Sequence, residues 1–321
     1  LPGHQDYKFM PSRKLQASQT PFLFAQKASS EIGNLKMRYW YYLITLEELI
    51  EKQKPAAFLV IHKDTILYEK YFGKFDAGFQ YNSFSVTKSF VNSLVGIAIE
   101  EGKIPSIDAK LTEMLPEFRN LPNFQGIEIK HLLDMTAGLE ARWNALNPFD
   151  HLARSYYGKD LRSFVQKIKR VAAPGEVFQY NNFNTVLLAM ILEKRTGMTT
   201  TQYLQEKLWN PLGMESDGIW LTDNKDSTGI EKAFCCLHAT ARDFAKYGRL
   251  YLHNGNWNGK QLIPCAWIDR IFNMESKQWD YQMHTSIMDA EPMTFAFRGL
   301  YNQNIYVNPA EELIIVSMNP A

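Results

Sequence analysis

The stretch Ser85-Val86-Thr87-Lys88 and the apolar run at 89–99 that follows it decide how this chain is expected to fold. Residues three apart lie on the same face of a helix, so the spacing brings the Ser85 hydroxyl close to the Lys88 amine. A serine hydroxyl is a useful nucleophile only when a base takes its proton, and a lysine can be that base where burial lowers its pKa. Gly102 and Pro105 end the run, so the pattern predicts a buried helix that begins at a nucleophile.

A second short motif, Tyr180-Asn181-Asn182, follows a turn at Pro174-Gly175. Residues two apart in an extended segment project to the same side, so Tyr180 and Asn182 are predicted to face one site. A phenol can act as a general acid or base, and an amide can hold a substrate carbonyl or a lysine amine. Alone, each motif also fits an ordinary role, a lysine that reaches solvent from a helix end and a tyrosine that packs.

Together the two motifs resemble those of the serine β-lactamase and penicillin-binding family, and more closely its branch of class C β-lactamases, esterases and 6-aminohexanoate-oligomer hydrolases. Three further stretches are similar to that family in the same order, at 65–72, 129–139 and 239–248. The resemblance implies an α/β (α+β) fold, with an antiparallel sheet flanked by helices and an inserted, mostly helical lobe. It also implies that Ser85, Lys88 and Tyr180 are catalytic and that Asn182 orients Lys88 or the substrate.

The third motif of the family departs from the usual pattern in this chain. Where many relatives carry a basic residue and a glycine on the strand beside the site, this sequence has Leu300 and Asn302. Loss of the basic residue argues against a carboxylate-bearing β-lactam as the preferred substrate, unless Arg298 supplies the charge from the same face of the strand. Tyr301 could line the pocket or simply pack. By resemblance, the backbone N–H groups of Ser85 and Gln303 are expected to form the oxyanion hole.

Composition fits a globular enzyme and excludes several other classes. The chain has 321 residues, 45% of them hydrophobic, with a net charge of +1, so nothing favours binding to nucleic acid. No run is long enough to span a membrane, and no metal-ligand or phosphate-loop pattern occurs, so neither a metal nor a cofactor is expected. The expected partner is a small ester or amide substrate, and the oligomeric state stays open. Cys235, Cys236 and Cys265 do not form a disulfide framework, and the adjacent pair is predicted to be two small buried thiols.

Residues 1–105 and 222–321 are predicted to form an α/β lobe and residues 106–221 a helical lobe, with the site where they meet. The clearest predicted helices are 45–52, 184–196, 200–208 and 243–253, and the clearest predicted strands are 57–61, 65–72, 304–308 and 313–318. Residues 1–30 are expected to be an extended lead-in. The first residue is Leu1, which favours a periplasmic or cell-envelope protein whose signal or anchor has been removed, while a cytoplasmic location stays open.

Three functions compete at this stage. The first is a serine hydrolase of small esters or amides that acts through an acyl-enzyme, and Leu300 favours it. The second is a β-lactamase or a penicillin-binding D-alanyl-D-alanine carboxypeptidase, which the two motifs favour and Leu300 disfavours. The third is a non-catalytic binder on the same scaffold, which is disfavoured because Ser85, Lys88 and Tyr180 are all present.

Overall fold

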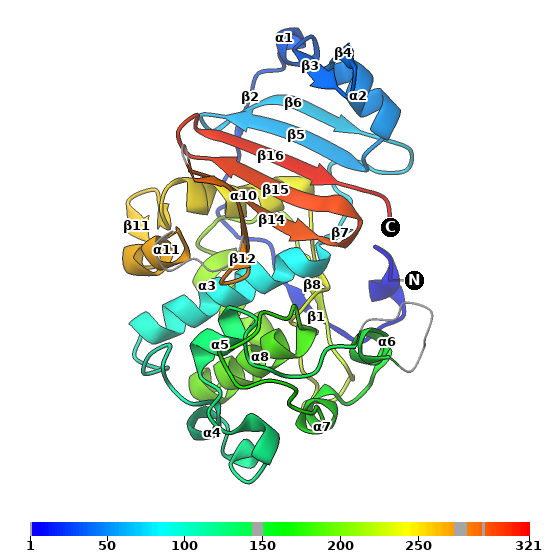
Figure 1. The fold of residues 1–321 in the computed structure, drawn as a ribbon. Coiled ribbons are helices and arrows are strands. Elements are labelled where there is room, and N and C mark those ends of the chain that lie inside the picture. Colours follow the sequence, from blue (N-terminus) through cyan, green and yellow to red (C-terminus); the bar gives the residue numbers. More distant parts are fainter. Residues whose placement is uncertain (1, 143–149, 273–280, 291–292) are drawn as a thin grey trace.

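The computed structural model describes residues 2–142, 150–272, 281–290 and 293–321. Its largest element is an eight-stranded sheet with the order β12-β13-β14-β15-β16-β5-β6-β2 (Figure 1). All neighbouring strands are antiparallel except β2 and β6, so the expected antiparallel sheet is confirmed, and it joins strands from both ends of the chain. The strands are β2 (Ala25–Gln26), β5 (Ala57–His62), β6 (Thr65–Tyr71), β12 (Tyr281–Gln282), β13 (Thr285–Ala290), β14 (Met293–Gly299), β15 (Gln303–Asn308) and β16 (Leu313–Met318).

Alternating residues of β5 bury against helices on the two faces of this sheet. Leu59 and Ile61 belong to the main core, where α10 (Ala241–Leu252) packs on the sheet. Val60 points the other way and packs with Leu46 and Ile50 of α2 (Leu46–Gln53) in a smaller cluster. Both helices were predicted, and a Thr45–Glu48 capping box sets the start of α2.

The predicted buried helix is α3 (Thr87–Glu100), which lies below the sheet in Figure 1 and packs against α8 (Asn182–Thr196). Most side chains of both helices are buried around the whole circumference, as a core helix requires. The predicted helix at 200–208 is α9 (Thr200–Leu204), continued by a π-helical turn at Gln205–Trp209. The remaining α-helices are α1 (Ser30–Gly33), α4 (Leu111–Met114), α5 (Ile129–Leu133), α6 (His151–Tyr157), α7 (Leu161–Gln166) and α11 (Cys265–Phe272).

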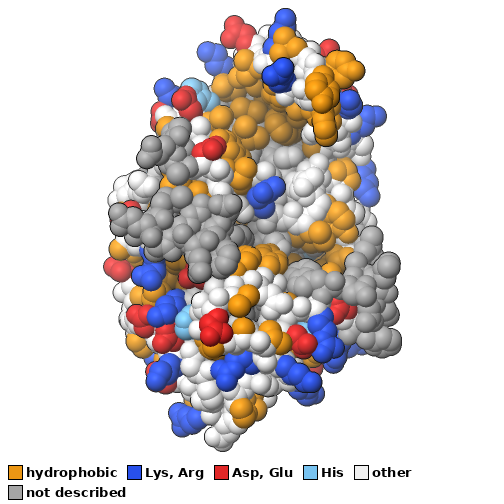
Figure 2. Space-filling view, viewed as in Figure 1, with side chains coloured by type: hydrophobic (Ala, Val, Ile, Leu, Met, Phe, Trp, Pro, Cys, Tyr) orange, Lys and Arg blue, Asp and Glu red, His pale blue; other side chains and the backbone are white. Residues whose placement is uncertain are grey.

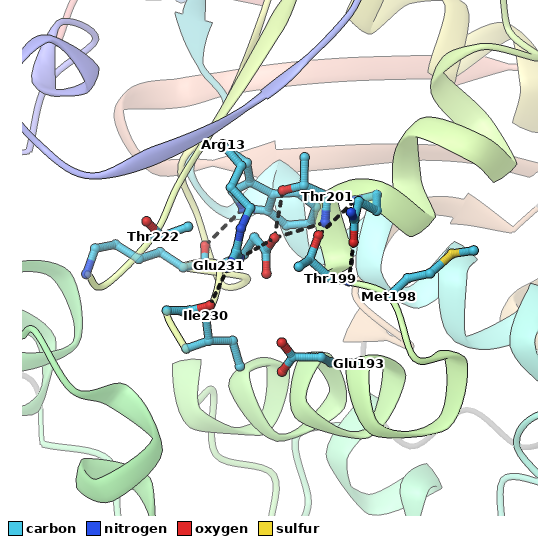
Figure 3. A network of polar contacts seen from close by, with 12 residues as sticks. Arg13, Glu193, Met198, Thr199, Thr201, Thr222, Ile230 and Glu231 are labelled. Carbon is cyan, nitrogen blue, oxygen red and sulfur yellow. Dashed lines mark hydrogen bonds and ion pairs between the residues drawn. The ribbon is translucent and has the colours of Figure 1, made fainter. Parts of the chain in front are cut away.

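A second, four-stranded sheet has the order β1-β8-β9-β7 and carries the N-terminal segment at its edge. It consists of β1 (Ser12–Leu15), β7 (Tyr81–Asn82), β8 (Gly218–Leu221) and β9 (Leu237–Ala239). Arg13 of β1 donates to Glu231 over 2.9 Å, and the same Glu231 oxygen accepts from the backbone and hydroxyl of Thr201 (Figure 3). The expected extended lead-in therefore contains strand β1, which is tied to the molecule by an ion pair between Arg13 and the buried Glu231.

Two small hairpins complete the described fold, β3 (Lys36–Tyr39) with β4 (Tyr42–Thr45) and β10 (Asn256–Trp257) with β11 (Lys260–Gln261). Apolar side chains gather at the end of the molecule that carries the first hairpin (Figure 2), where Trp40, Tyr41, Tyr42 and Leu43 are exposed. Within the described residues, no helix is both long and apolar enough to cross a bilayer.

Candidate active site

The Ser85 turn is held by the residues immediately before it. Ser85 lies in a 3-10 turn, Phe84–Val86, between β7 and α3. Phe84 has a positive φ of 46°, which is unfavourable for an aromatic residue, and its backbone N–H donates to Asn82 Oδ1 over 3.0 Å. A strained backbone that is fixed by a side-chain hydrogen bond is typical of a segment that aims a functional group.

Lys88 lies one turn after Ser85 and is fully buried. Its Nζ is 3.0 Å from Ser85 Oγ and donates to the backbone carbonyl of Phe234 over 2.7 Å. Burial lowers the pKa of Lys88 well below its ordinary value, because the charged ammonium loses its hydration. A neutral amine with one hydrogen bond to a carbonyl can direct its lone pair at the serine hydroxyl, which is what a general base needs.

The Tyr180 ring lies close to the same amine. Lys88 Nζ lies 4.8 Å from the centre of the Tyr180 ring. The neighbours of Tyr180 are bonded to the stretch at 129–139: Gln179 N donates to Met135 O over 2.8 Å, and Asn181 Nδ2 donates to Leu139 O over 2.9 Å. Asn181 also caps α8, so the segment that carries Tyr180 is fixed at both sides.

These groups open into a pocket of about 770 Å³. Four of the site residues predicted from the sequence line this pocket: Ser85, Tyr180, Asn182 and Leu300. Five of the ten other lining residues are large apolar or aromatic residues: Pro2, Phe84, Leu152, Tyr156 and Phe234. Among the lining residues that the structure describes, Arg298 alone carries a charged side chain.

The third motif reaches the pocket through its first residues. Arg298, Gly299 and Leu300 line the pocket, whereas Tyr301, Asn302 and Gln303 are not among its lining residues. The Gln303 side chain is directed away to Asn319, from whose backbone N–H it accepts and to whose carbonyl it donates.

Gly299 brings the end of this strand close to Ser85. A Cβ there would lie 2.4 Å from Ser83 O and 3.3 Å from Ser85 N, so only glycine fits without movement. The end of β14 therefore lies directly against the backbone amide of Ser85.

The adjacent cysteines differ from the prediction in one respect. Both are buried as expected, but Cys235 and Cys236 form a disulfide with each other. The backbone turns at Cys236, where φ is 75°, and this conformation cannot be inferred from two sequence letters. Cys235 lines the pocket, and Phe234, the residue before it, supplies the carbonyl that holds Lys88.

Sequence reasoning missed three groups that shape this site: Asn82, the Phe234 carbonyl and Gly299. Asn82 could have been found, because an asparagine two residues before a turn residue is a common side-chain cap. Nothing in the sequence marks the Phe234 carbonyl, since every residue has one. Within the described part of the chain, no group of three or more His, Cys, Asp or Glu side chains could hold a metal ion.

Comparison with known proteins shows the family and the fold of this chain. A sequence model of the β-lactamase family matches residues 46–318. The 6-aminohexanoate-dimer hydrolase of Paenarthrobacter ureafaciens is 26% identical over 298 residues, which cover 85% of this chain and 74% of that protein. The solved structure named "Putative 6-aminohexanoate-dimer hydrolase from Bacillus anthracis" has a TM-score of 0.88 and 26% identity, over 99% of this chain and 88% of that one. A penicillin binding protein from Bacillus halodurans, at 18% identity and a TM-score of 0.69 over 86% of this chain and 95% of that one, shows the same fold.

Proposed function

Because the chain belongs to the β-lactamase family, a family of hydrolases, we propose that it cleaves an ester or amide through an acyl-enzyme on Ser85. The observation that carries this proposal is the buried Lys88 amine 3.0 Å from Ser85 Oγ. Burying a charged lysine side chain costs free energy, because the ammonium loses its hydration. The same burial lowers the pKa of Lys88, and the neutral amine can then accept a proton.

The proposed reaction begins when Ser85 Oγ attacks the substrate carbonyl and Lys88 takes the hydroxyl proton. The carbonyl oxygen becomes an oxyanion, to which the backbone N–H of Ser85 donates. The C–O or C–N bond then breaks as Tyr180 donates its hydroxyl proton to the leaving alcohol or amine, and Lys88 passes the proton it took from Ser85 on to Tyr180. Water attacks the resulting ester and gives a proton to the Lys88 and Tyr180 pair. The bond to Ser85 Oγ then breaks, the pair passes that proton to Ser85 Oγ, and the acid leaves.

A second oxyanion donor is proposed at the end of β14. Gly299 lies against Ser85 N, whereas Gln303 is outside the pocket lining. The backbone at 299–300 is thus better placed than the amide of Gln303, which the family resemblance had suggested. Asn182 retains its proposed role in orienting the substrate or Lys88, since it lines the same pocket.

The pocket favours a small substrate with an apolar body. Its lining is mostly hydrophobic, and Arg298 offers one cation that could pair with a carboxylate. A linear amide such as the 6-aminohexanoate dimer named in the Paenarthrobacter relative is one candidate. Because Arg298 could pair with the carboxylate of a β-lactam, it also supports a second candidate function, that of a β-lactamase or carboxypeptidase.

Two activity probes separate these functions. Purified protein is incubated with a fluorophosphonate and, separately, with a fluorescent penicillin, and the labelled peptide is located by mass spectrometry. Labelling of Ser85 by the fluorophosphonate alone supports the ester or amide hydrolase. Labelling by both supports the penicillin-recognising enzyme, and labelling by neither favours a non-catalytic binder.

A cell-envelope location is part of the proposal, and the Cys235–Cys236 disulfide supports it, because disulfides persist mainly in oxidising compartments. Fractionation of the source cells, with protein recovered in the envelope or periplasm, is the expected result. Recovery with the cytosol would contradict this location.

A further inference from the structure

The first residues of the chain form part of the pocket wall. Pro2 lines the pocket, and His4 is only 3% exposed. The His4 ring is surrounded by four aromatic rings whose centres lie 5.6 to 6.2 Å away, those of Phe75, Phe79, Tyr81 and Phe84. A histidine buried in such a cage needs hydrogen bonds for both ring nitrogens.

Both ring nitrogens of His4 have partners, and these fix its tautomer. Asn82 N donates to Nδ1 over 2.9 Å, and Nε2 lies 2.8 Å from the backbone carbonyl of Asn319. A backbone N–H only donates and a carbonyl only accepts, so His4 must be neutral with its proton on Nε2. Burial lowers the pKa of His4, in agreement with this neutral form.

The two partners of His4 connect it to two segments that border Ser85. Asn82 holds the backbone amide of Phe84, the residue before Ser85. The Asn319 carbonyl also accepts from Gln303 Nε2 over 3.0 Å, and Gln303 is paired with Gly299 across the β14–β15 hairpin. The imidazole is therefore a bridge between the nucleophile turn and the strand end that lies against Ser85 N.

The segment that carries His4 is anchored on both sides of it. Gly3 N and the Tyr156 hydroxyl both donate to Asp6 Oδ2, over 3.0 and 2.6 Å. Further along, the ion pair between Arg13 and Glu231 fixes β1 (Figure 3). These contacts hold the imidazole in place, so that its hydrogen bonds can determine the positions of the groups it touches.

We propose that His4 is a positioning residue for the hydrolytic reaction, acting through its Nδ1 acceptor on Asn82 and thereby on the Ser85 turn. This proposal rests on the proposed function of Ser85. The hydrogen bond from Asn82 N sets the turn, while the hydrogen bond from Nε2 to Asn319 secures the strand end. Loss of the first bond leaves a buried N–H without an acceptor, and the turn shifts to satisfy it.

Substitution of His4 by asparagine or by glutamine distinguishes the roles of its two ring nitrogens. In His4→Asn the side-chain oxygen can occupy the position of Nδ1 and keep the acceptor, whereas in His4→Gln the terminal NH₂ can occupy the position of Nε2 and keep only the donor. We expect His4→Gln to lower kcat roughly 10- to 100-fold with KM within about 2-fold, because a small misplacement of a nucleophile is costly. His4→Asn should retain kcat to within about 3-fold.

The measurements are hydrolysis of a p-nitrophenyl acyl ester, the rate of fluorophosphonate labelling of Ser85, and the melting temperature. The same two changes at His62, a partly exposed residue of β5, are the matched controls. A merely structural role predicts similar melting and similar kcat for His4→Asn and His4→Gln, and that result would overturn the inference. Wild-type protein that is not labelled would overturn the proposed function and this inference with it.

A second pair of variants tests the next link if His4→Gln does not fold. Asn82→Asp keeps an oxygen to accept from Phe84 N, whereas Asn82→Ala removes it. We expect labelling of Ser85 to be slowed roughly tenfold more in Asn82→Ala than in Asn82→Asp. Equal labelling rates in folded samples of the two variants would show that this route does not position Ser85.

Discussion

The two sides of the pocket are built in different ways. On one side, Lys88 is fully buried and its amine is fixed between the Ser85 hydroxyl and the Phe234 carbonyl. On the other side, the residues at the end of β14 are exposed: Leu300 is 51% exposed, and Arg298 is also on the surface. Proton transfer needs fixed distances and a dry environment, whereas substrate selection needs side chains that can change without harm to the fold. The comparison predicts that substitutions on the first side abolish activity and that those on the second side redirect it.

Ser85→Ala should have the largest effect. Without the nucleophile we expect ester hydrolysis to fall by roughly three to six powers of ten, with an unchanged melting temperature. Hydrolysis of a p-nitrophenyl acyl ester and circular dichroism melting are the measurements. Near wild-type turnover would mean that another group attacks the substrate.

Lys88→Ala and Tyr180→Phe should each reduce the rate by roughly 10²- to 10⁴-fold, the usual range for a lost acid or base. The double variant should be little worse than either single variant, because the two groups are proposed to handle one proton in sequence. A double-mutant cycle on kcat tests this coupling. Losses that multiply would show that the two residues act independently.

Changes at the strand end should alter selectivity more than rate. A new cation in Leu300→Lys should raise the ratio of penicillin to neutral-ester acylation by roughly 10- to 100-fold, the value of a charge-assisted hydrogen bond. Arg298→Ala should lower that ratio if Arg298 already binds a carboxylate. Leu43→Lys, on the exposed hairpin β3–β4, adds the same charge outside the pocket and is the control.

The two strand-end variants also decide which residue is the carboxylate anchor. Arg298 is identified as that anchor if the ratio of penicillin to neutral-ester acylation is unchanged in Leu300→Lys but falls strongly in Arg298→Ala. The sequence-based argument against a β-lactam substrate would then be wrong.

The smallest expected effect is on stability. Lys88→Met should raise the melting temperature by roughly 2–4 °C at pH 7, because methionine has no charge to lose on burial, while it lowers activity as Lys88→Ala does. The folded state lowers the pKa of Lys88, so the unfolded chain binds more protons and wild-type stability rises with pH up to the ordinary lysine pKa of about 10.4. The advantage of Lys88→Met should therefore shrink between pH 7 and 10.

Lys207→Met is the matched control for that measurement. Hydrogen bonds that Lys207 donates to Glu101 and Glu206 raise the pKa of Lys207, so its charged form is stabilised by folding. Its removal should not stabilise the protein. If wild type proves more stable than Lys88→Met at pH 7, the contacts of the amine outweigh its desolvation.

Sequence patterns predicted the elements whose causes are local. The antiparallel hairpin of β5 and β6 follows from two strand-forming runs, 57–61 and 65–72, on either side of the turn at 62–64, and α2 follows from the Thr45 cap. The spacing of Ser85 and Lys88 predicted their contact, because helical geometry alone brings them together. The division into two lobes with the stated boundaries stays a prediction.

What the sequence could not predict depends on contacts between distant segments or on backbone atoms. His4 and Asn82 are separated by 78 positions, and nothing in the sequence near residue 4 indicates that aromatic rings will surround His4. The carbonyl that holds Lys88 belongs to Phe234, a residue that composition would assign only to packing. Leu300 and Gln303 were grouped as one motif. The hairpin turn between them separates the two side chains, so that Leu300 lines the pocket and Gln303 bonds to Asn319.

The contrast between Gly299 and Leu300 has a consequence for how new activities could arise on this scaffold. At residue 299 any side chain would collide with the backbone at Ser83, so evolution has no freedom there. One residue later, the half-exposed Leu300 side chain lies at the pocket edge and can be exchanged at little cost to folding. A laboratory library randomised at residue 300 should therefore yield many folded enzymes with different substrate ranges, while one at residue 299 should return almost only glycine.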